Sequence, residues 1–176
     1  MIEVTGTFDE KMDRLKELIQ EKPCLILPMA IPGSGKSYIS KKIVQVCGND
    51  KVKIVSTDAI RKELFGSEES QEDNNLVFLI AHRQCRKWFY HGFSVIFDAV
   101  NIDQSSRNWS YKRAIPFAMQ GEISKIVINI ETELETALER NRTRKRFVPE
   151  NVIYSFLKSK QLPKENECDY IITINN

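Results

Sequence analysis

The sequence lacks the features that would place it in a specialised class of protein. Its four cysteines are scattered without a C-x-x-C pair, and His82 and His91 have no partnering cysteine. These spacings fit neither a disulfide framework nor a zinc site, so we expect a protein of a reducing, cytoplasmic compartment with two structural or solvated histidines. The N-terminus has no leader-like apolar run, and the longest apolar stretch, residues 24–31, is well short of the ~20 residues that span a bilayer. We therefore expect no membrane partner.

Strong charge bias is also missing. The net charge of the 176 residues is only +2, with 41% apolar and 28% charged residues, as in an ordinary globular protein. This balance neither demands nor excludes a nucleic-acid partner. The length suits one domain, 1–176, and the chain has no internal repeat, low-complexity segment or Pro/Gly/Ser-rich linker. Composition leaves protein partners and oligomeric state open.

Short apolar runs alternate with segments of helical periodicity. Thr7 and Glu10 have the spacing of a capping box, as do Thr132 and Glu135. Strands are predicted over 24–28, 52–55, 94–97, 125–130 and 170–174, and helices over 8–22, 37–46, 60–65, 76–90, 104–113, from 134 and from 150. The alternation predicts an α/β fold of three layers, with a mostly parallel central sheet and helices on both faces. Ligands of such sheets bind beyond the carboxyl ends of the strands.

Glycine is sparse, yet two of the seven glycines fall in P-M-A-I-P-G-S-G-K-S, residues 28–37. Glycines let the chain curl where a strand gives way to a helix, so that backbone N–H groups point inward and form a cradle for phosphate oxygens. Lys36 can reach the β- and γ-phosphates, and the Ser37 hydroxyl can ligate Mg²⁺. The usual pattern begins with glycine where this chain has Ala30, which is acceptable only if φ there is not positive. The loop predicts a nucleoside triphosphate site.

Two aspartates follow predicted strands. Asp58, in V-S-T-D-A-I-R, can take a proton from an attacking hydroxyl, and Arg61, one helical turn later, can hold an anionic acceptor. The alternative is that Asp58 only caps a helix. Asp98 ends the strand of V-I-F-D-A-V-N and can help to place Mg²⁺, or it can cap the next helix. Ala99 stands where motor ATPases commonly carry a glutamate, which argues against a motor.

The segment E-R-N-R-T-R-K-R-F-V-P, residues 139–149, is strongly basic. Arg140 and Arg144 share a helix face at i, i+4 spacing. A mobile segment of this kind can close over a triphosphate and stabilise charge on the transferring phosphoryl group. A solvated helix face or a nonspecific nucleic-acid patch is the alternative. We expect a small lid at about 141–148.

Together these motifs resemble the P-loop kinases grouped with the 5′-hydroxyl kinase domain of bacteriophage polynucleotide kinase. The resemblance rests on A-I-P-G-S-G-K-S, S-T-D-A-I-R-K-E-L-F-G, F-D-A-V-N-I-D-Q-S-S-R and R-N-R-T-R-K-R-F-V-P-E-N-V-I, and runs from about residue 24 to 162. It implies a P-loop kinase fold, ATP as co-substrate and Mg²⁺. The D-A-V-N stretch has one residue more than the D-T-N form of the phage enzyme, so Asn101 need not superpose, and Arg107 receives no role.

The resemblance also implies a role for each matching residue. Catalysis falls to Lys36, Asp58 and Arg144, and the acceptor side to Asp58, Arg61 and Asp98. Ser37 is the implied metal ligand. The implied nucleotide-binding residues are Pro32, Gly33, Ser34, Gly35, Lys36, Ser37, Tyr38, Arg140 and Arg144.

The acceptor is less defined than the donor. A polynucleotide needs cationic and aromatic side chains, which H-R-Q-C-R-K-W-F-Y-H, residues 82–91, supplies, although a packed helix with a charged outer side has the same pattern. We therefore expect an ATP-dependent kinase of a hydroxyl, preferably the 5′-hydroxyl of a polynucleotide. The alternatives are a kinase of a small metabolite, nucleoside or sugar nucleotide, and a nucleotide-dependent switch without transfer chemistry.

Overall fold

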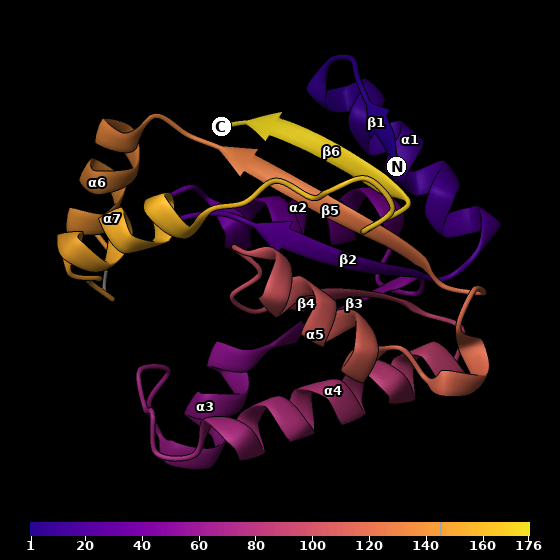
Figure 1. The fold of residues 1–176 in the computed structure, drawn as a ribbon, viewed down its shortest axis with the longest axis horizontal. Helices are drawn as coiled ribbons and strands as arrows, with labels where there is room; N and C mark the ends of the chain where they lie inside the picture. The colour runs from indigo at the N-terminus through magenta and orange to yellow at the C-terminus, as the bar shows by residue number, and fades with distance from the viewer. Residues whose placement is uncertain (145) are drawn as a thin grey trace.

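The computed structural model describes residues 1–144 and 146–176. Its centre is a six-stranded sheet of order β1-β6-β5-β2-β4-β3, and every described pairing is parallel (Figure 1). The strands are β1 (Ile2–Val4), β2 (Cys24–Met29), β3 (Val52–Ser56), β4 (Ser94–Asp98), β5 (Ser124–Glu131) and β6 (Tyr170–Asn175). The chain winds from β2 out to β3 and returns through β4, and then continues on the other side of β2. The loop after β2 therefore lies where the winding reverses, the usual ligand position in such sheets.

Helices cover both faces of the sheet, as the alternating sequence predicts (Figure 1). They are α1 (Phe8–Glu21), α2 (Lys36–Cys47), α3 (Thr57–Phe65), α4 (Asn74–Tyr90), α5 (Gln104–Ala114), the 3₁₀ turn η1 (Phe117–Met119), α6 (Leu134–Arg142) and α7 (Glu150–Ser159). The apolar sides of α1 and α2 share one core cluster, while those of α3 to α7 contribute to the other. No helix in the described part of the chain is both long and apolar enough to cross a membrane.

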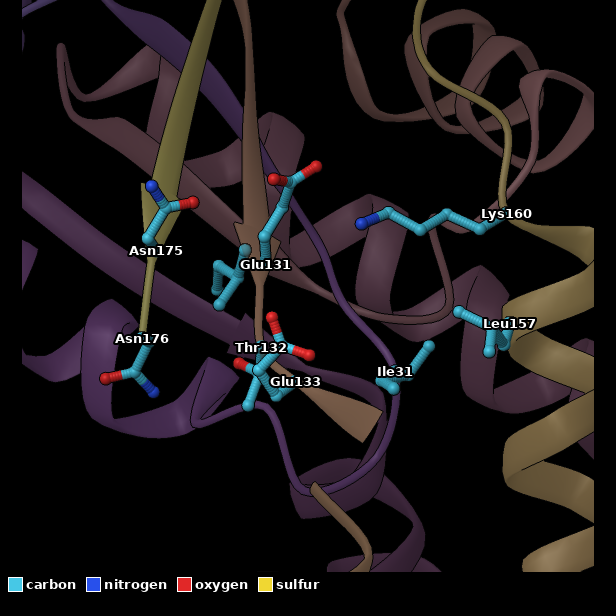
Figure 2. Close-up of a pocket in the computed structure, with 9 residues that line it drawn as sticks. Ile31, Glu131, Thr132, Glu133, Leu157, Lys160, Asn175 and Asn176 are labelled. Atoms are coloured by element: carbon cyan, nitrogen blue, oxygen red, sulfur yellow. The ribbon is translucent and has the colours of Figure 1, made fainter. Parts of the chain in front are cut away.

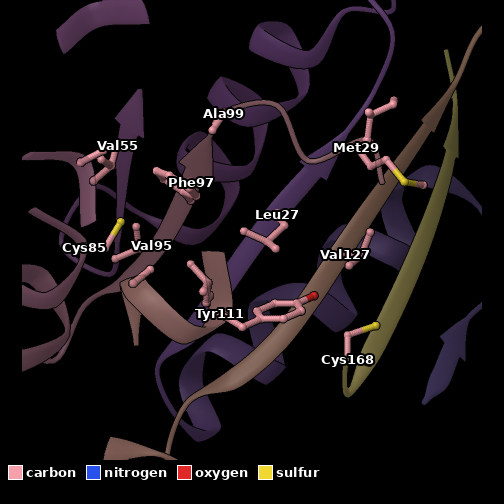
Figure 3. Close-up of a cluster of buried hydrophobic side chains, with 14 of the residues drawn as sticks. Leu27, Met29, Val55, Cys85, Val95, Phe97, Ala99, Tyr111, Val127 and Cys168 are labelled. Carbon is pink, nitrogen blue, oxygen red and sulfur yellow. The ribbon is translucent and has the colours of Figure 1, made fainter. Parts of the chain in front are cut away.

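Successive side chains of β2 point to opposite faces of the sheet, and each face has its own hydrophobic core cluster. Leu25, Leu27 and Met29 point into the larger cluster, whereas Cys24 and Ile26 belong to the smaller one, and all five are fully buried. Figure 3 shows the larger cluster, with Leu27 between the side chains of the neighbouring strands. A central strand buried on both faces needs apolar residues throughout, which explains the uninterrupted run C-L-I-L before the loop.

Side-chain caps mark the starts of several helices. The predicted box at Thr7 and Glu10 is present, Ser56 caps α3 and Asp103 caps α5. Neither Asp58 nor Asp98 is therefore a helix cap. The capping box predicted at Thr132 is wrong, because α6 has no side-chain cap and the Thr132 hydroxyl donates to the Ser34 carbonyl instead. Strand β1 was not predicted.

Candidate active site

The loop between β2 and α2 has the backbone that a phosphate cradle requires. Gly33 and Gly35 adopt positive φ angles of 89° and 85°. A side chain at Gly33 would also collide with the backbone carbonyl of Ala137 in α6, so glycine is required there on both grounds. Ala30 is not among the described residues of positive φ, of which Asn166 is the one that is not glycine. Alanine at the first position of the motif is thus compatible with the loop.

The loop is held from two neighbouring strand ends. Ser34 is buried, and its hydroxyl and N–H both donate to the Ile31 carbonyl, at 2.8 and 3.2 Å. The Ser34 carbonyl in turn accepts hydrogen bonds from Thr132 Oγ1, at 3.3 Å, and from Asn176 Nδ2, at 2.8 Å. Since these donors follow β5 and β6, the shape of the loop is fixed by the sheet rather than by the glycines alone.

Lys36, at the start of α2, reaches across to the end of β4. Its Nζ lies 2.6 Å from Asp98 Oδ1 and donates to the Ala99 carbonyl at 3.3 Å. The two side chains are 28% and 15% exposed, so the pair is largely shielded from solvent. Asp98 Oδ1 is buried and accepts no hydrogen bond of good geometry; the contact with Lys36 is an ion pair. This carboxylate oxygen can still accept a further cationic or donating partner.

The residues at this point suit Mg²⁺ bound together with phosphates. No group of three or more His, Cys, Asp or Glu side chains in 1–144 and 146–176 forms a metal cage. Mg²⁺ usually needs no such cage, because it keeps waters and takes one or two protein oxygens plus substrate phosphates. Ser37, in the first turn of α2, and Asp98 are the residues that would contribute oxygens.

Asp58 lies at the same edge of the sheet. Ser56, the last residue of β3, pairs in register with Asp98, the last residue of β4, and Asp58 follows two residues later in the first turn of α3. The Thr57 hydroxyl donates to the Asp98 carbonyl at 3.4 Å, which ties the start of α3 to the end of β4. The backbone therefore brings Asp58 and Asp98 to the same edge of the sheet.

Both oxygens of Asp58 are engaged by arginines. Arg61 Nη1 lies 3.0 Å from Oδ1, and Arg146 Nη1 lies 2.6 Å from Oδ2. Arg61 Nη2 also donates to Asn74 Oδ1 at 2.9 Å, and the residue as a whole is only 9% exposed. Arg61 is therefore held mainly by protein groups, and an acceptor phosphate would have to compete with them.

Two hydrogen bonds between Asn141 and Val148 connect the two ends of the arginine-rich segment. Asn141 Nδ2 donates to the Val148 carbonyl at 2.7 Å, and the Val148 N–H donates to Asn141 Oδ1 at 3.0 Å. Arg140 and Arg144, the predicted lid arginines, are both exposed, whereas Arg146 of the same segment contacts Asp58. Lys145, within the predicted lid, lies outside the described residues. The lid at about 141–148, with Arg140 and Arg144 over the donor phosphates, stays a prediction, and the contact of Arg146 with Asp58 was not predicted.

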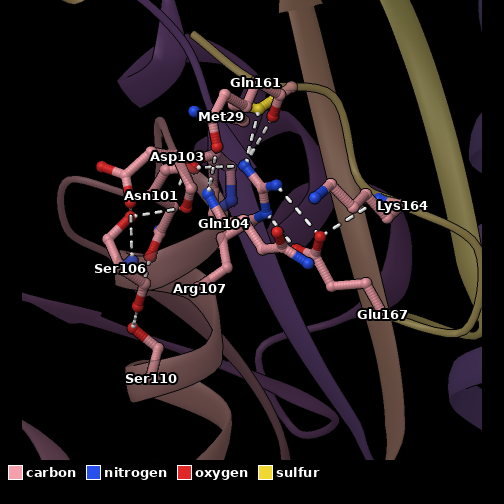
Figure 4. Close-up of polar contacts among 11 residues, drawn as sticks. Met29, Asn101, Asp103, Gln104, Ser106, Arg107, Ser110, Gln161, Lys164 and Glu167 are labelled. Atoms are coloured by element: carbon pink, nitrogen blue, oxygen red, sulfur yellow. Dashed lines mark hydrogen bonds and ion pairs between the residues drawn. The ribbon is translucent and has the colours of Figure 1, made fainter. Parts of the chain in front are cut away.

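A buried network of ionic and hydrogen-bonding contacts connects the end of β4 to the segment around Gln161 and Glu167 (Figure 4). Arg107 is fully buried, and its Nε lies 2.5 Å from Glu167 Oε1. Its Nη1 donates to the carbonyls of Gln161 and Asn101. The Asn101 amide donates to the Phe97, Ala99 and Pro28 carbonyls, at 3.0, 3.3 and 3.4 Å. Asn101 is thus a structural bridge between the strands that carry Asp98 and the loop.

A cleft of about 610 Å³ opens beside the loop, between the ends of β5 and β6 and helix α7 (Figure 2). Burial lowers the pKa of Lys160, and the nearby Glu131 opposes that change. The described lining does not include Lys36, Asp58 or Asp98. It consists of Ile31, Ile130, Glu131, Thr132, Glu133, Leu157, Lys160, Asn175 and Asn176.

The model of the AAA domain family matches residues 25–163, a span that includes the loop, both aspartates and the arginine-rich segment. The chain belongs to the AAA domain family. No curated protein sequence matches it.

Solved structures share the fold of this AAA domain at low identity. A gluconokinase from Sinorhizobium meliloti 1021 is 18% identical with a TM-score of 0.56, and the match covers 87% of this chain and 82% of that one. A chain of the Pnkp1/Rnl/Hen1 RNA repair complex is 18% identical with a TM-score of 0.62, covering 82% of this chain and 50% of that one. A fungal RNA kinase is 14% identical with a TM-score of 0.60, covering 87% and 38%. These likenesses establish the P-loop kinase fold.

Three residues of the AAA domain site were missed by sequence reasoning. Asn74 holds Arg61, Asn176 holds the loop, and Arg146 pairs with Asp58. Arg146 carried a weak signal, since it belongs to the basic run, but Asn74 and Asn176 carried none. Tyr38, predicted to bind the nucleotide, is 63% exposed in the first turn of α2 and lies free to contact a ligand there.

Proposed function

We propose that this AAA domain is an ATP- and Mg²⁺-dependent phosphotransferase that moves the γ-phosphate to a hydroxyl, most specifically the 5′-hydroxyl of a polynucleotide. The observation that carries the proposal is the shared edge of β3 and β4. There the Thr57 hydroxyl ties the start of α3, which carries Asp58, to the end of β4, where Asp98 pairs with Lys36 at the end of the glycine loop. A loop alone would fit any nucleotide-binding protein, whereas a carboxylate beside it supplies a base for an acceptor.

On the donor side, the backbone N–H groups of residues 32–37 and the N-terminus of α2 hold the phosphates. Lys36 moves from Asp98 to the β- and γ-phosphates, and Ser37 and Asp98 would hold Mg²⁺. When bound, the metal offsets negative charge on the phosphates. Arg140 and Arg144 close over the triphosphate, and the cleft at Ile31 receives the nucleoside.

On the acceptor side, Asp58 takes the proton of the hydroxyl while the oxygen bonds to the γ-phosphorus. The bond between that phosphorus and the β–γ bridging oxygen breaks, and ADP leaves with the electron pair. Asp58 is 43% exposed, so a hydroxyl can reach it once Arg146 withdraws from Oδ2. Holding the two substrates in line contributes about 7–11 kcal/mol to lowering the barrier.

Two candidate acceptors have support in different observations. The similarity to RNA kinase structures and the basic residues of α4 favour a polynucleotide end. The similarity to a gluconokinase and the burial of Arg61 favour a small metabolite, because Arg61 is already held by Asp58 and Asn74. A nucleotide-dependent switch without transfer explains the loop but leaves Asp58 without a task.

The test incubates the protein with [γ-³²P]ATP, Mg²⁺ and a panel of 5′-hydroxyl oligonucleotides, nucleosides and sugars. Label on oligonucleotide ends supports the polynucleotide kinase, and label only on small molecules selects the metabolite kinase. Free phosphate without a labelled acceptor selects the switch. Asp58→Asn, run in parallel, should lower the rate of labelling by about 10²–10⁴ if the label arises at this site.

A further inference from the structure

Helices α4 and α5 carry a pattern that the phosphoryl-transfer site does not use. They lie side by side on one face of the sheet (Figure 1). Neither helix contains an aspartate or a glutamate. Besides the buried Arg107 they carry the cations Arg83, Arg86, Lys87, Lys112 and Arg113. A surface of two neighbouring helices with cations and no anions attracts polyanions.

Aromatic side chains fill the contact between these two helices. The Trp109 ring lies 5.0 Å from the Phe78 ring and 4.6 Å from His82, both edge to face. His82 and Phe78 in turn rest on Phe97, the residue before Asp98. Trp109 is nevertheless 41% exposed, so the cluster holds its indole in place while leaving part of it open to solvent.

Cations flank this aromatic cluster. Arg86 follows His82 by one helical turn on α4, and Arg113 follows Trp109 by one turn on α5, so each arginine belongs to the helix face that carries the neighbouring ring. The residues share one line at helical spacing, with Phe78, His82 and Arg86 at i, i+4 on α4. We call this line the α4–α5 seam, defined by Phe78, His82, Arg86, Trp109 and Arg113.

The seam begins beside the proposed acceptor base. Asn74, at the start of α4, holds Arg61, which pairs with Asp58, and Phe78 follows one turn later. The loop before α4 is acidic, with Glu68, Glu69, Glu72 and Asp73. Repulsion from these carboxylates would disfavour a polyanion on the loop and leave the cationic α4 and α5 as the more favourable path.

We propose that the α4–α5 seam binds the single strand downstream of the reacting 5′ end, with a base stacked on Trp109 and backbone phosphates at Arg86 and Arg113. Aromatic platforms flanked by cations are the usual means of binding single strands without sequence preference. The placement of the strand's end rests on the proposed function, whereas binding of the strand itself does not. A small metabolite would leave the seam empty.

The primary test measures binding without ATP. A fluorescent 5′-hydroxyl 12-mer oligoribonucleotide is titrated with wild type, Trp109→Ala and Trp109→Phe, and fluorescence anisotropy gives the Kd. Loss of one stacked base should raise the Kd about 5- to 100-fold in the alanine variant, while phenylalanine retains most of the affinity. Phe117→Ala, which removes an aromatic side chain that is 88% exposed outside the seam, is the matched control and should match wild type.

The arginines are tested by salt dependence. Arg86→Gln/Arg113→Gln should reduce the slope of log K against log salt by about 1.4, since each single-strand phosphate contact contributes about 0.7. Polyglutamate, an anion without bases, should compete less well than an unlabelled single strand. Equal competition by polyglutamate, or Kd values unchanged in both seam variants, overturns the proposal.

A kinase assay separates this inference from the proposed function. With acceptors of 1, 4, 8 and 12 nucleotides, wild type should show a KM that falls with length, and Trp109→Ala should remove that fall without altering the rate on the single nucleotide. If oligonucleotides are phosphorylated but their KM is independent of length, the seam is wrong and the kinase stands. If the 12-mer binds at the seam but is never phosphorylated, the polynucleotide kinase is wrong and the seam stands. Melting temperatures establish that each variant is folded.

Discussion

Asp58 Oδ2 lies 2.6 Å from Nη1 of Arg146, a residue 88 positions further along the chain. The pair joins the first turn of α3 to the arginine-rich segment, the two parts proposed to hold acceptor and donor. With Arg61 on the other oxygen, each carboxylate oxygen of Asp58 contacts an arginine. The proposed mechanism therefore requires Arg146 to leave Oδ2 before a hydroxyl approaches Asp58, which would couple opening of the arginine-rich segment to exposure of the base.

The first prediction concerns this contact. Asp58→Asn removes the charge that holds Arg146, so the arginine-rich segment should open more often and be cut faster by trypsin. Both partners are partly exposed, at 29% and 43%, so the pair contributes at most about 1 kcal/mol. This corresponds to roughly a 2- to 5-fold faster cleavage. Glu63→Gln, on the same helix, is the control, and identical digestion of all three proteins would contradict the contact.

The second prediction concerns the chemical step. Asp58→Asn should lower turnover by about 10²–10⁴, the usual contribution of a general base, and leave the Kd for ATP essentially unchanged. The asparagine keeps the size of the side chain and its place in α3, so a loss of fold is not expected. Single-turnover kinetics and calorimetric titration with an ATP analogue separate the two effects. Wild-type turnover in the variant would remove Asp58 from the mechanism.

Local sequence was enough to predict what the chain builds from consecutive residues. The run C-L-I-L predicts a buried strand, the glycines that follow predict the curl, and β-strand ends predict where Asp58 and Asp98 project. Each of these depends on a few neighbouring residues and on the rule that parallel strands end at one edge.

What the sequence could not predict depends on partners far away in the chain. Strand β1 has three residues and exists because it pairs with β6, almost the whole chain away. Thr132 looks like a helix cap, but its hydroxyl serves the Ser34 carbonyl, which lies 98 residues earlier. Arg107 received no role, because Glu167 is 60 residues later and nothing local marks the pair.

The third prediction tests the loop backbone. Gly33→Ala places a methyl group against the Ala137 carbonyl, whereas Gly66→Ala faces open space at a similar φ of 75°. Both variants bear the strain of left-handed backbone, about 1–2 kcal/mol. Only Gly33→Ala also displaces the loop, so its Kd for an ATP analogue should rise by tenfold or more, which is about 1.4 kcal/mol or above. Equal affinities in the two glycine variants, measured by calorimetry, would show that the loop does not bind the nucleotide.

The fourth prediction concerns the buried pair of Arg107 and Glu167. Glu167→Gln leaves the buried guanidinium without its counter-charge and should lower the free energy of unfolding by about 3–5 kcal/mol. The matched control is Glu17→Gln, which removes an ion pair of 2.8 Å that is exposed and should cost less than about 1 kcal/mol. Urea denaturation measures both. The double variant Arg107→Met/Glu167→Met leaves no unpaired buried charge. Its loss of unfolding free energy should therefore be smaller than the sum of the losses in Arg107→Met and Glu167→Met.

The fifth prediction concerns pH. Burial, together with Arg86 and Arg113, lowers the pKa of His82 from 6.5 to about 4. Between these values the unfolded chain binds a proton at His82 that the folded protein does not bind. Stability is therefore retained above the unfolded pKa and lost as pH falls from about 6.5 toward 4, with a slope that approaches 1.4 kcal/mol per pH unit. Urea midpoints of wild type and His82→Gln at pH 8, 7, 6, 5 and 4.5 measure it. The variant should be flatter below pH 6.5, and the two proteins should change in parallel between pH 7 and 8. Parallel curves over the whole range would mean that His82 is protonated equally in both states, and that the aromatic cluster does not exclude its charge.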